Sequence, residues 1–513
     1  MKKLLLSLFA ASLLGATGSL RANALLDAED AVKNGAPITM YQHLAAHPLF
    51  PIVEYQHWKN HLYDVRGVTN FLHAHPDSYF SDDLAKSAYE QWLNTNPRAI
   101  VNSYQEVFAN DDVTCLYQRA KGQFCSSKDM VSPAAQSIYD AAGRDVGEAL
   151  AIARGSQISG NKDYEKAYNR LVSKLAKNDY PETYEMWSRM PAGSQSDNTT
   201  YDVIAYAMRH NGWAQLPQLM SRLDQKSFEK AEVQYWLGRA MEKTGNRGRA
   251  QEYFQKAARQ RDYFGFLAAE KIGAPPVFNY KHTRQDNSQR AHVMNGVQRA
   301  LILKSLGRNG QALEELKALA KGKPPALVEQ IALVTHQQGW HFAAISILAQ
   351  AKIWDNLDMR FPIKYRTEVE RLARQHRIKP SEIYAIIRKE SIFQEDARSQ
   401  AGARGLMQVM PATARDTANK YGLGYGGPES LTDPNTNLAI GTQYLTNRLQ
   451  EFGNLAVAAA SYNAGPNRAR QWLDKYPSLP LDEWIAQIPF NETRDYVKKV
   501  MEYEKIYEYL LRQ

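Results

Sequence analysis

The chain has 513 residues, 44% of them hydrophobic and 23% charged, which is enough for two to four domains with more than one buried core. Its 63 Lys and Arg against 54 Asp and Glu give a formal charge of +9, but the basic residues are scattered rather than clustered. Scattered charge is typical of a solvated surface, so we expect no nucleic-acid partner. The alternative, binding of a polyanion such as nucleic acid or an acidic wall polymer, has only the net charge in its favour.

Residues 1–24 have the pattern of a secretory signal peptide. Lys2 and Lys3 precede an apolar run over residues 4–14, and Ala-Asn-Ala at 22–24 offers a small-x-small cleavage site. Cleavage there would remove three basic residues and no acidic one, which lowers the charge from +9 to +6. No later apolar run approaches the ~20 residues that a membrane-spanning helix needs. We therefore expect an exported, soluble protein with no transmembrane span.

The two cysteines, Cys115 and Cys125, lie close together in the sequence. In the oxidising space outside the cytoplasm such a pair favours a disulfide, and a loop this short would contribute ~2–3 kcal/mol. Two free thiols are the alternative.

Two histidine pairs have the i, i+4 spacing that can hold a metal ion on one helix face, His43 with His47 and His57 with His61. Neither pair has an accompanying third ligand in the sequence. We expect packing or exposed histidines here, with no metal site and no cofactor.

Residues 25–282 form a succession of amphipathic helical segments separated by short Gly, Pro, Asn or Asp breaks, which predicts a helical solenoid. The clearest unit has Gly238, then Ala250, Phe254 and Ala257, at the spacing of small and large packing residues in tetratricopeptide-like helix pairs. Such pairs bury their apolar faces only by stacking on neighbours. The repeats therefore predict a shape rather than a chemistry.

Two boundaries follow the solenoid. The prolines at 275–276 and the polar run at 281–289 mark the first, after which residues 283–357 have the pattern of a small helical linker domain. Residues 358–513 differ in texture, because long Gly/Pro/Asn loops such as 422–434 interrupt their helices. Loops held on a rigid scaffold are where functional sites usually lie.

One acid in this last segment stands where an apolar residue is expected. Ile383, Ile386 and Ile387 set an i, i+3, i+4 stripe, and its next member, at i+7, is Glu390. Burial of an acid without a partner raises its pKa and favours the protonated form, which is the state a general acid needs near neutral pH. Pairing of Glu390 with a basic neighbour at the surface is the alternative.

Three downstream blocks add groups that bind polyols. Residues 402–411 combine a glycine-flanked turn with an amide and two methionines, and the small-residue run 456–461 leads to Tyr-Asn-Ala-Gly at 462–465. Glu492 and Tyr496, four residues apart, share one face of a helix. An acid, amides, tyrosines and methionines together are typical of a sugar-binding site.

At these blocks the chain resembles the large soluble lytic murein transglycosylases, periplasmic enzymes with a goose-lysozyme-like catalytic domain. The resembling blocks are Glu390-Ser391, residues 405–408, residues 431–444, residues 462–465 and residues 492–496. The resemblance implies a mainly α fold: a helical superhelix, a small helical linker domain and an α-rich lysozyme-like domain at the C-terminus. It also implies a periplasmic location.

The implied activity is cleavage of the β-1,4 bond between N-acetylmuramic acid and N-acetylglucosamine, with formation of a 1,6-anhydro ring. Glu390 would be the single general acid and base, and the partner would be a peptidoglycan glycan strand bound by a monomer. The groove residues implied by the resemblance are Ser391, Met407, Gln408, Met410, Tyr462, Asn463, Glu492 and Tyr496.

Two other functions stay open at this point. A lysozyme-type hydrolase would need Asp396 or Glu492 as a second carboxylate. A scaffold without catalysis would use the solenoid to hold glycan or protein. Single residues also have purely structural explanations. The tyrosines would then be core aromatics, the methionines would fill gaps in the core, and Glu492 would be an ion-pair partner.

Overall fold

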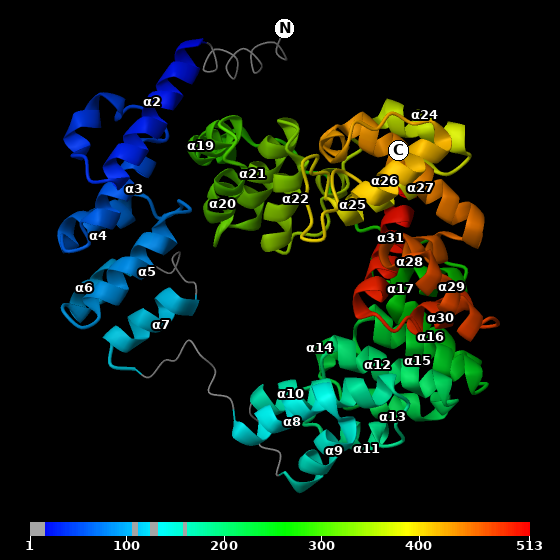
Figure 1. Ribbon diagram of the computed structural model, residues 1–513. Coiled ribbons are helices and arrows are strands. Elements are labelled where there is room, and N and C mark those ends of the chain that lie inside the picture. The colour runs from blue at the N-terminus through cyan, green and yellow to red at the C-terminus, as the bar shows by residue number, and fades with distance from the viewer. Residues whose placement is uncertain (1–15, 105–110, 124–131, 157–161) are drawn as a thin grey trace. The chain divides into compact units, whose positions relative to one another are not determined.

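The computed structural model describes residues 16–104, 111–123, 132–156 and 162–513 (Figure 1). In these ranges the secondary structure is helical apart from two isolated β-bridges between residues 398 and 409, so the mainly α fold expected from the sequence is confirmed. Among the helices described, none is both long and apolar enough to cross a membrane.

The helices group into two compact units, each built from two separate segments of the chain. The first unit combines residues 1–130 with residues 281–360. Buried side chains of its N-terminal helices form one core, which Leu303 and Ala312 of the second segment join. Its helices are α2 (Ala16–Lys33), η1 (Ile38–Leu44), α3 (Phe50–Asn60), α4 (Val65–Ala74), α5 (Ser81–Trp92), α6 (Pro97–Ser103), α7 (Asp111–Ala120), α18 (Asn287–Ala291), α19 (Met294–Ser305), α20 (Asn309–Ala320), α21 (Pro325–Gln337), α22 (His341–Gln350) and α23 (Leu357–Arg360).

The second unit combines residues 131–280 with residues 361–513. The helices of its first segment are α8 (Pro133–Arg144), α9 (Val146–Gly155), α10 (Lys162–Lys177), α11 (Thr183–Arg189), α12 (Asp197–Arg209), η3 (Gly212–Gln215), α13 (Leu216–Met220), α14 (Gln225–Phe228), α15 (Ala231–Lys243), α16 (Arg247–Ala257) and α17 (Tyr263–Lys271). Those of its second segment are α24 (Arg366–His376), α25 (Pro380–Glu390), α26 (Pro411–Tyr421), η4 (Pro428–Thr432), α27 (Pro434–Phe452), α28 (Leu455–Ala464), α29 (Pro466–Lys475), α30 (Leu481–Ala486) and α31 (Asn491–Leu511).

The helix pair expected around Gly238 is formed by α15 and α16, which pack on each other. Gly238 faces the ring of Phe254, and a Cβ at this position would lie 2.6 Å from the ring's Cε1 atom. A side chain would therefore push the two helices apart. The spacing of a small residue opposite a large one thus explains how this pair packs closely.

In the C-terminal segment, α31 is a shared packing partner of two other helices. Both α25 and α28 pack against α31, and α27 packs against α28. The small residues 456–460 of α28 are all buried, which lets neighbouring backbones approach closely. On α25, Pro380 occupies the first turn and the Glu382 carboxylate accepts the N–H of Lys379 at 2.8 Å, so the helix start is capped.

Some sequence predictions fall outside the described residues. Cys125 and residues 1–15 lie there, while Cys115 is buried on α7, so the Cys115–Cys125 disulfide and the signal peptide stay predictions. The predicted solenoid, residues 25–282, contributes helices to both units. We retain its separation from a linker at 283–357 and a catalytic domain at 358–513 as a proposal.

Candidate functional site

Glu390 is the last residue of α25, on the side of the helix that faces the core. Ile383, Ile386 and Ile387 are fully buried, as their stripe indicates. The Glu390 side chain, in contrast, keeps part of its surface exposed to solvent. The hydroxyl of Tyr496, on α31, donates a hydrogen bond to Oε1 of Glu390 at 2.6 Å. The acid therefore has a fixed position and can still be reached from solvent.

The surroundings of Glu390 shift its titration toward neutral pH. Desolvation by the surrounding protein raises the pKa of Glu390 from 4.5 to about 7, and the negative charge of Glu492 acts in the same direction. The Tyr496 hydrogen bond and the positive charge of Lys389 oppose this by favouring the carboxylate. The partial negative charge at the C-terminus of α25 also favours the neutral acid. Near neutral pH the carboxyl can therefore both give and accept a proton.

Tyr496 is held as a hydrogen-bond donor. It is 3% exposed, and burial together with the charge of Glu390 keeps the pKa of its hydroxyl well above 10. The ammonium of Lys389 lies 5.4 Å from the centre of the Tyr496 ring. The phenol thus stays protonated throughout the range in which Glu390 titrates.

The turn over residues 402–411 depends on a glycine that no other residue could replace. Gly405 has φ +74°, and a Cβ there would lie 2.1 Å from the carbonyl oxygen of Leu431. Gln408 also has a positive φ, of 46°, and its Nε2 donates to the carbonyls of Ala397 at 3.1 Å and Gly405 at 3.0 Å. The amide nitrogen of Gln408 therefore secures the turn itself.

Asn437, on α27, holds the same turn and was not singled out from the sequence. Its side chain is fully buried, donates to the carbonyls of Arg404 and Leu431 at 2.8 and 2.9 Å, and accepts the N–H of Met407 at 2.8 Å. Asn437 shares a helix face with Gly441, which lies against the Met407 side chain. A polar residue on an inward face, the signal that identified Glu390, could also have identified Asn437.

Tyr462, at the end of α28, connects this turn to the acid. Its hydroxyl donates to the carbonyl oxygen of Met407 at 2.8 Å, and its ring centre lies 5.2 Å from that of Tyr444 in an edge-on arrangement. Burial raises the pKa of Tyr462 well above 10, and the nearby charge of Glu390 adds to the effect. The structure thus brings Glu390, Tyr496, Tyr462 and the Met407 main chain together.

The other expected site residues differ in how exposed they are. Met407 has no exposed side-chain surface, and Ser391 is 5% exposed with its hydroxyl on a main-chain carbonyl of its own helix at 3.3 Å. Met410 is 39% exposed, and Glu492 lies exposed in the first turn of α31. The side-chain oxygen of Asn463 accepts the hydroxyl of Thr493 at 2.7 Å. This hydrogen bond ties α28 to the start of α31.

The backbone directly after the acid is strained. Ile392 and Phe393 have φ values of 54° and 65°, in the left-handed region that a β-branched residue such as Ile strongly disfavours. Phe393 is buried, so its packing holds the turn in place. Strain of this kind persists only where surrounding contacts over-determine the conformation, and it is frequent at functional sites.

Comparison with known proteins identifies the family. Family models match three parts of the chain: the soluble lytic murein transglycosylase L domain over residues 292–357, the transglycosylase SLT domain over 369–485 and the soluble lytic transglycosylase helical domain over 487–513. The soluble lytic murein transglycosylase of Escherichia coli K12 is 32% identical over 297 residues, which are 57% of this chain and 46% of that protein. These matches assign residues 292–513 to the soluble lytic murein transglycosylase family.

Another member, from Salmonella typhimurium, is 30% identical over 360 residues, 69% of this chain and 56% of that protein. The chain thus spans about half the length of the curated relatives that it matches. Solved structures extend the similarity. An inactive Glu-to-Gln mutant of the lytic transglycosylase Slt from Pseudomonas aeruginosa gives a TM-score of 0.78 at 25% identity, covering 95% of this chain and 97% of that one. The 70 kDa soluble lytic transglycosylase of Escherichia coli, with a TM-score of 0.67 at 23% identity and 96% of each chain covered, has the same fold.

Proposed function

We propose that this protein is a periplasmic lytic transglycosylase that cleaves the β-1,4 bond between N-acetylmuramic acid and N-acetylglucosamine in peptidoglycan and leaves 1,6-anhydromuramoyl ends. The observation that carries the proposal is the Glu390 carboxyl, partly exposed, fixed by Tyr496 and with a pKa of about 7. Membership of the family supports the substrate class. The inactive Glu-to-Gln mutant of the Pseudomonas aeruginosa relative is consistent with a glutamate at the centre of the reaction.

In the proposed reaction Glu390 acts twice. Its protonated form gives its proton to the glycosidic oxygen as the bond to the anomeric carbon breaks, and N-acetylglucosamine leaves as an alcohol. The resulting carboxylate then takes the proton of the muramoyl C6 hydroxyl, whose oxygen attacks the anomeric carbon and closes the anhydro ring. The substrate's acetamido group can assist the departure. Because the nucleophile belongs to the substrate, one protein carboxylate is sufficient.

A pKa near the working pH suits both steps, since a general acid and its conjugate base are then both populated. Tyr496 would hold the carboxyl in one orientation, and Tyr462 would hold the Met407 carbonyl beside it. Met407 would therefore act through its main chain. We propose that the sugar-binding groove is lined by the side chains of Ser391, Gln408, Met410, Tyr462, Asn463, Glu492 and Tyr496.

The test is a digest of purified peptidoglycan by the full-length protein, analysed by mass spectrometry. Wild-type protein should release muropeptides that are one water lighter than hydrolysis products, and Glu390→Gln should release almost none while its circular dichroism stays helical. Glu252→Gln, at an exposed position on α16, is the matched control and should keep wild-type activity.

Each rival function gives a different product. Release of reducing-end products alone would show a lysozyme-type hydrolase, in which Asp396 or Glu492 directs a water or acts as nucleophile. Release of no product by wild-type protein that still binds glycan would show a scaffold without catalysis. Unchanged cleavage by Glu390→Gln would show that another group is the acid.

A further inference from the structure

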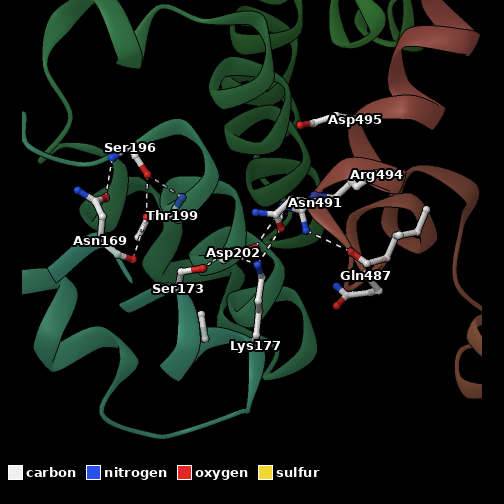
Figure 2. A network of polar contacts seen from close by, with 12 residues as sticks. Asn169, Ser173, Lys177, Ser196, Thr199, Asp202, Gln487, Asn491, Arg494 and Asp495 are labelled. Carbon is white, nitrogen blue, oxygen red and sulfur yellow. Dashed lines mark hydrogen bonds and ion pairs between the residues drawn. The ribbon is translucent and has the colours of Figure 1, made fainter. Parts of the chain in front are cut away.

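Arg494, two residues before Tyr496 on α31, is a buried cation whose counter-ion comes from a distant part of the chain. It is 2% exposed, and its Nη2 lies 3.2 Å from Oδ1 of Asp202, on α12, which is also 2% exposed (Figure 2). Its guanidinium carbon lies 4.1 Å from the ring centre of Tyr201, the preceding residue of α12. Asp202 lies far outside residues 369–485, which match the transglycosylase SLT domain.

Asp202 is fully engaged in this contact. Its Oδ2 lies 3.2 Å from the ammonium of Lys177 and accepts the hydroxyl of Ser173, both on α10. Lys177 also donates to Oδ1 of Asn491 at 2.8 Å, and Arg494 donates to the same oxygen at 3.1 Å (Figure 2). One carboxylate therefore joins α10 and α12 to the first turn of α31. A buried arginine without such a partner would be very unfavourable, so the start of α31 is fixed by this contact.

The same stretch of α31 is held on its other side by the acid. Residues two apart on a helix point about 200° apart, so Arg494 and Tyr496 address different neighbours. Arg494 turns to α12, while Tyr496 turns to Glu390 on α25. A displacement of the first turns of α31 toward or away from α12 would thus change the hydrogen bond between Tyr496 and Glu390.

We propose that Asp202 is a positioning residue for Glu390, which it acts on through Arg494, α31 and the hydroxyl of Tyr496. The helical segment before the catalytic domain would then set the geometry of the acid as well as supply surface for a glycan strand. This inference rests on the proposed transglycosylase function. Misplacement of a catalytic group by about 1 Å can lower the rate ~100-fold, so the effect is large enough to measure.

The test compares full-length variants on purified peptidoglycan, with kcat and the pH profile of kcat/KM as readouts. Asp202→Asn keeps the shape of the side chain but removes its charge, and should lower kcat ~100-fold. Lys177→Met leaves the Arg494–Asp202 pair intact but removes the partly exposed cation beside Asp202, so it should lower kcat by less than Asp202→Asn does. Asp197→Asn, at an exposed ion pair on the same helix, is the control and should match wild type.

The pH profile separates positioning from general destabilisation. Glu390 is faced by Lys389 of its own helix, by Glu492 and Tyr496 of α31 and by Tyr462 of α28. Loss of the Tyr496 hydrogen bond raises the pKa of Glu390, so Asp202→Asn and Tyr496→Phe should both move the alkaline limb to higher pH. In the double variant the limb should move no further than in Tyr496→Phe alone.

The proposal would be overturned if Lys177→Met and folded Asp202→Asn both kept the kcat and pH profile of wild type. It would also be overturned if the effects of Asp202→Asn and Tyr496→Phe on the pH profile were additive. If circular dichroism shows that Asp202→Asn does not fold, Lys177→Met decides alone. Failure of the proposed function is recognised separately, because wild-type protein would then release no anhydro-ended product, whatever the effect of Asp202→Asn.

Discussion

Glu390→Gln should make the folded protein more stable at alkaline pH and leave its stability unchanged in acid. The pKa of Glu390 is about 7 in the folded state against an ordinary value of 4.5, and each pKa unit corresponds to ~1.4 kcal/mol. Ionised Glu390 therefore costs the folded state about 3 kcal/mol. A glutamine has no charge to desolvate, and its side-chain oxygen can still accept the hydroxyl of Tyr496.

The sign follows from which state binds more protons. Below pH 4.5 the carboxyl is neutral in the folded and unfolded chain, so the two proteins should be equally stable. As the pH rises from 4.5 to 7 the unfolded chain ionises first, and wild-type protein progressively loses the stability that the neutral acid gave it. Above 7 the loss is complete, and the advantage of Glu390→Gln reaches its maximum.

The assay is thermal unfolding of wild type, Glu390→Gln and Glu252→Gln across this pH range. A chain with two units does not unfold in one step, so the midpoint to compare is that of the transition which Glu390→Gln moves. At about pH 8 we expect this midpoint to rise by roughly 5–10 °C. Glu252→Gln, at an exposed carboxyl, should follow wild type. A constant difference between Glu390→Gln and wild type at every pH would contradict this prediction, because it would mean that folding does not raise the pKa of Glu390.

Three further substitutions test the contacts around the acid. Tyr496→Phe should raise the pKa of Glu390, and the alkaline limb of kcat/KM should move to higher pH; an unmoved limb would contradict the hydrogen bond. Asn437→Ala removes three buried hydrogen bonds and should lower the free energy of unfolding by about 3 kcal/mol in urea titrations. Gly405→Ala should prevent residues 361–513 from folding correctly, because its Cβ would overlap the carbonyl oxygen of Leu431. Gly402→Ala, with a similar positive φ but open space around it, is the control and should cost only about 1 kcal/mol. Equal losses for the two glycines would contradict the clash.

Helical periodicity in the sequence was sufficient to predict the helices and to identify Glu390 as the candidate acid. Apolar residues recur with the period of a helix through most of the chain, and this period depends only on neighbours three and four positions apart. The same rule made Glu390 stand out, because a carboxyl on an inward face is costly unless it has a use. The glycines at 402 and 405 likewise marked a turn from their residue type alone, and the resemblance at five blocks gave the family.

The surroundings of the acid depend on contacts between distant parts of the chain. Tyr496 lies 106 residues from Glu390, and Asp202 lies 292 residues from Arg494, so no local pattern connects either pair. The pKa of about 7 arises from desolvation by several helices at once, which depends on how those helices pack. Met407 illustrates the limit: its side chain is fully buried, and its carbonyl is the part that meets Tyr462. Periodicity shows which face of a helix turns inward, whereas contacts between distant segments depend on the packing of the whole unit.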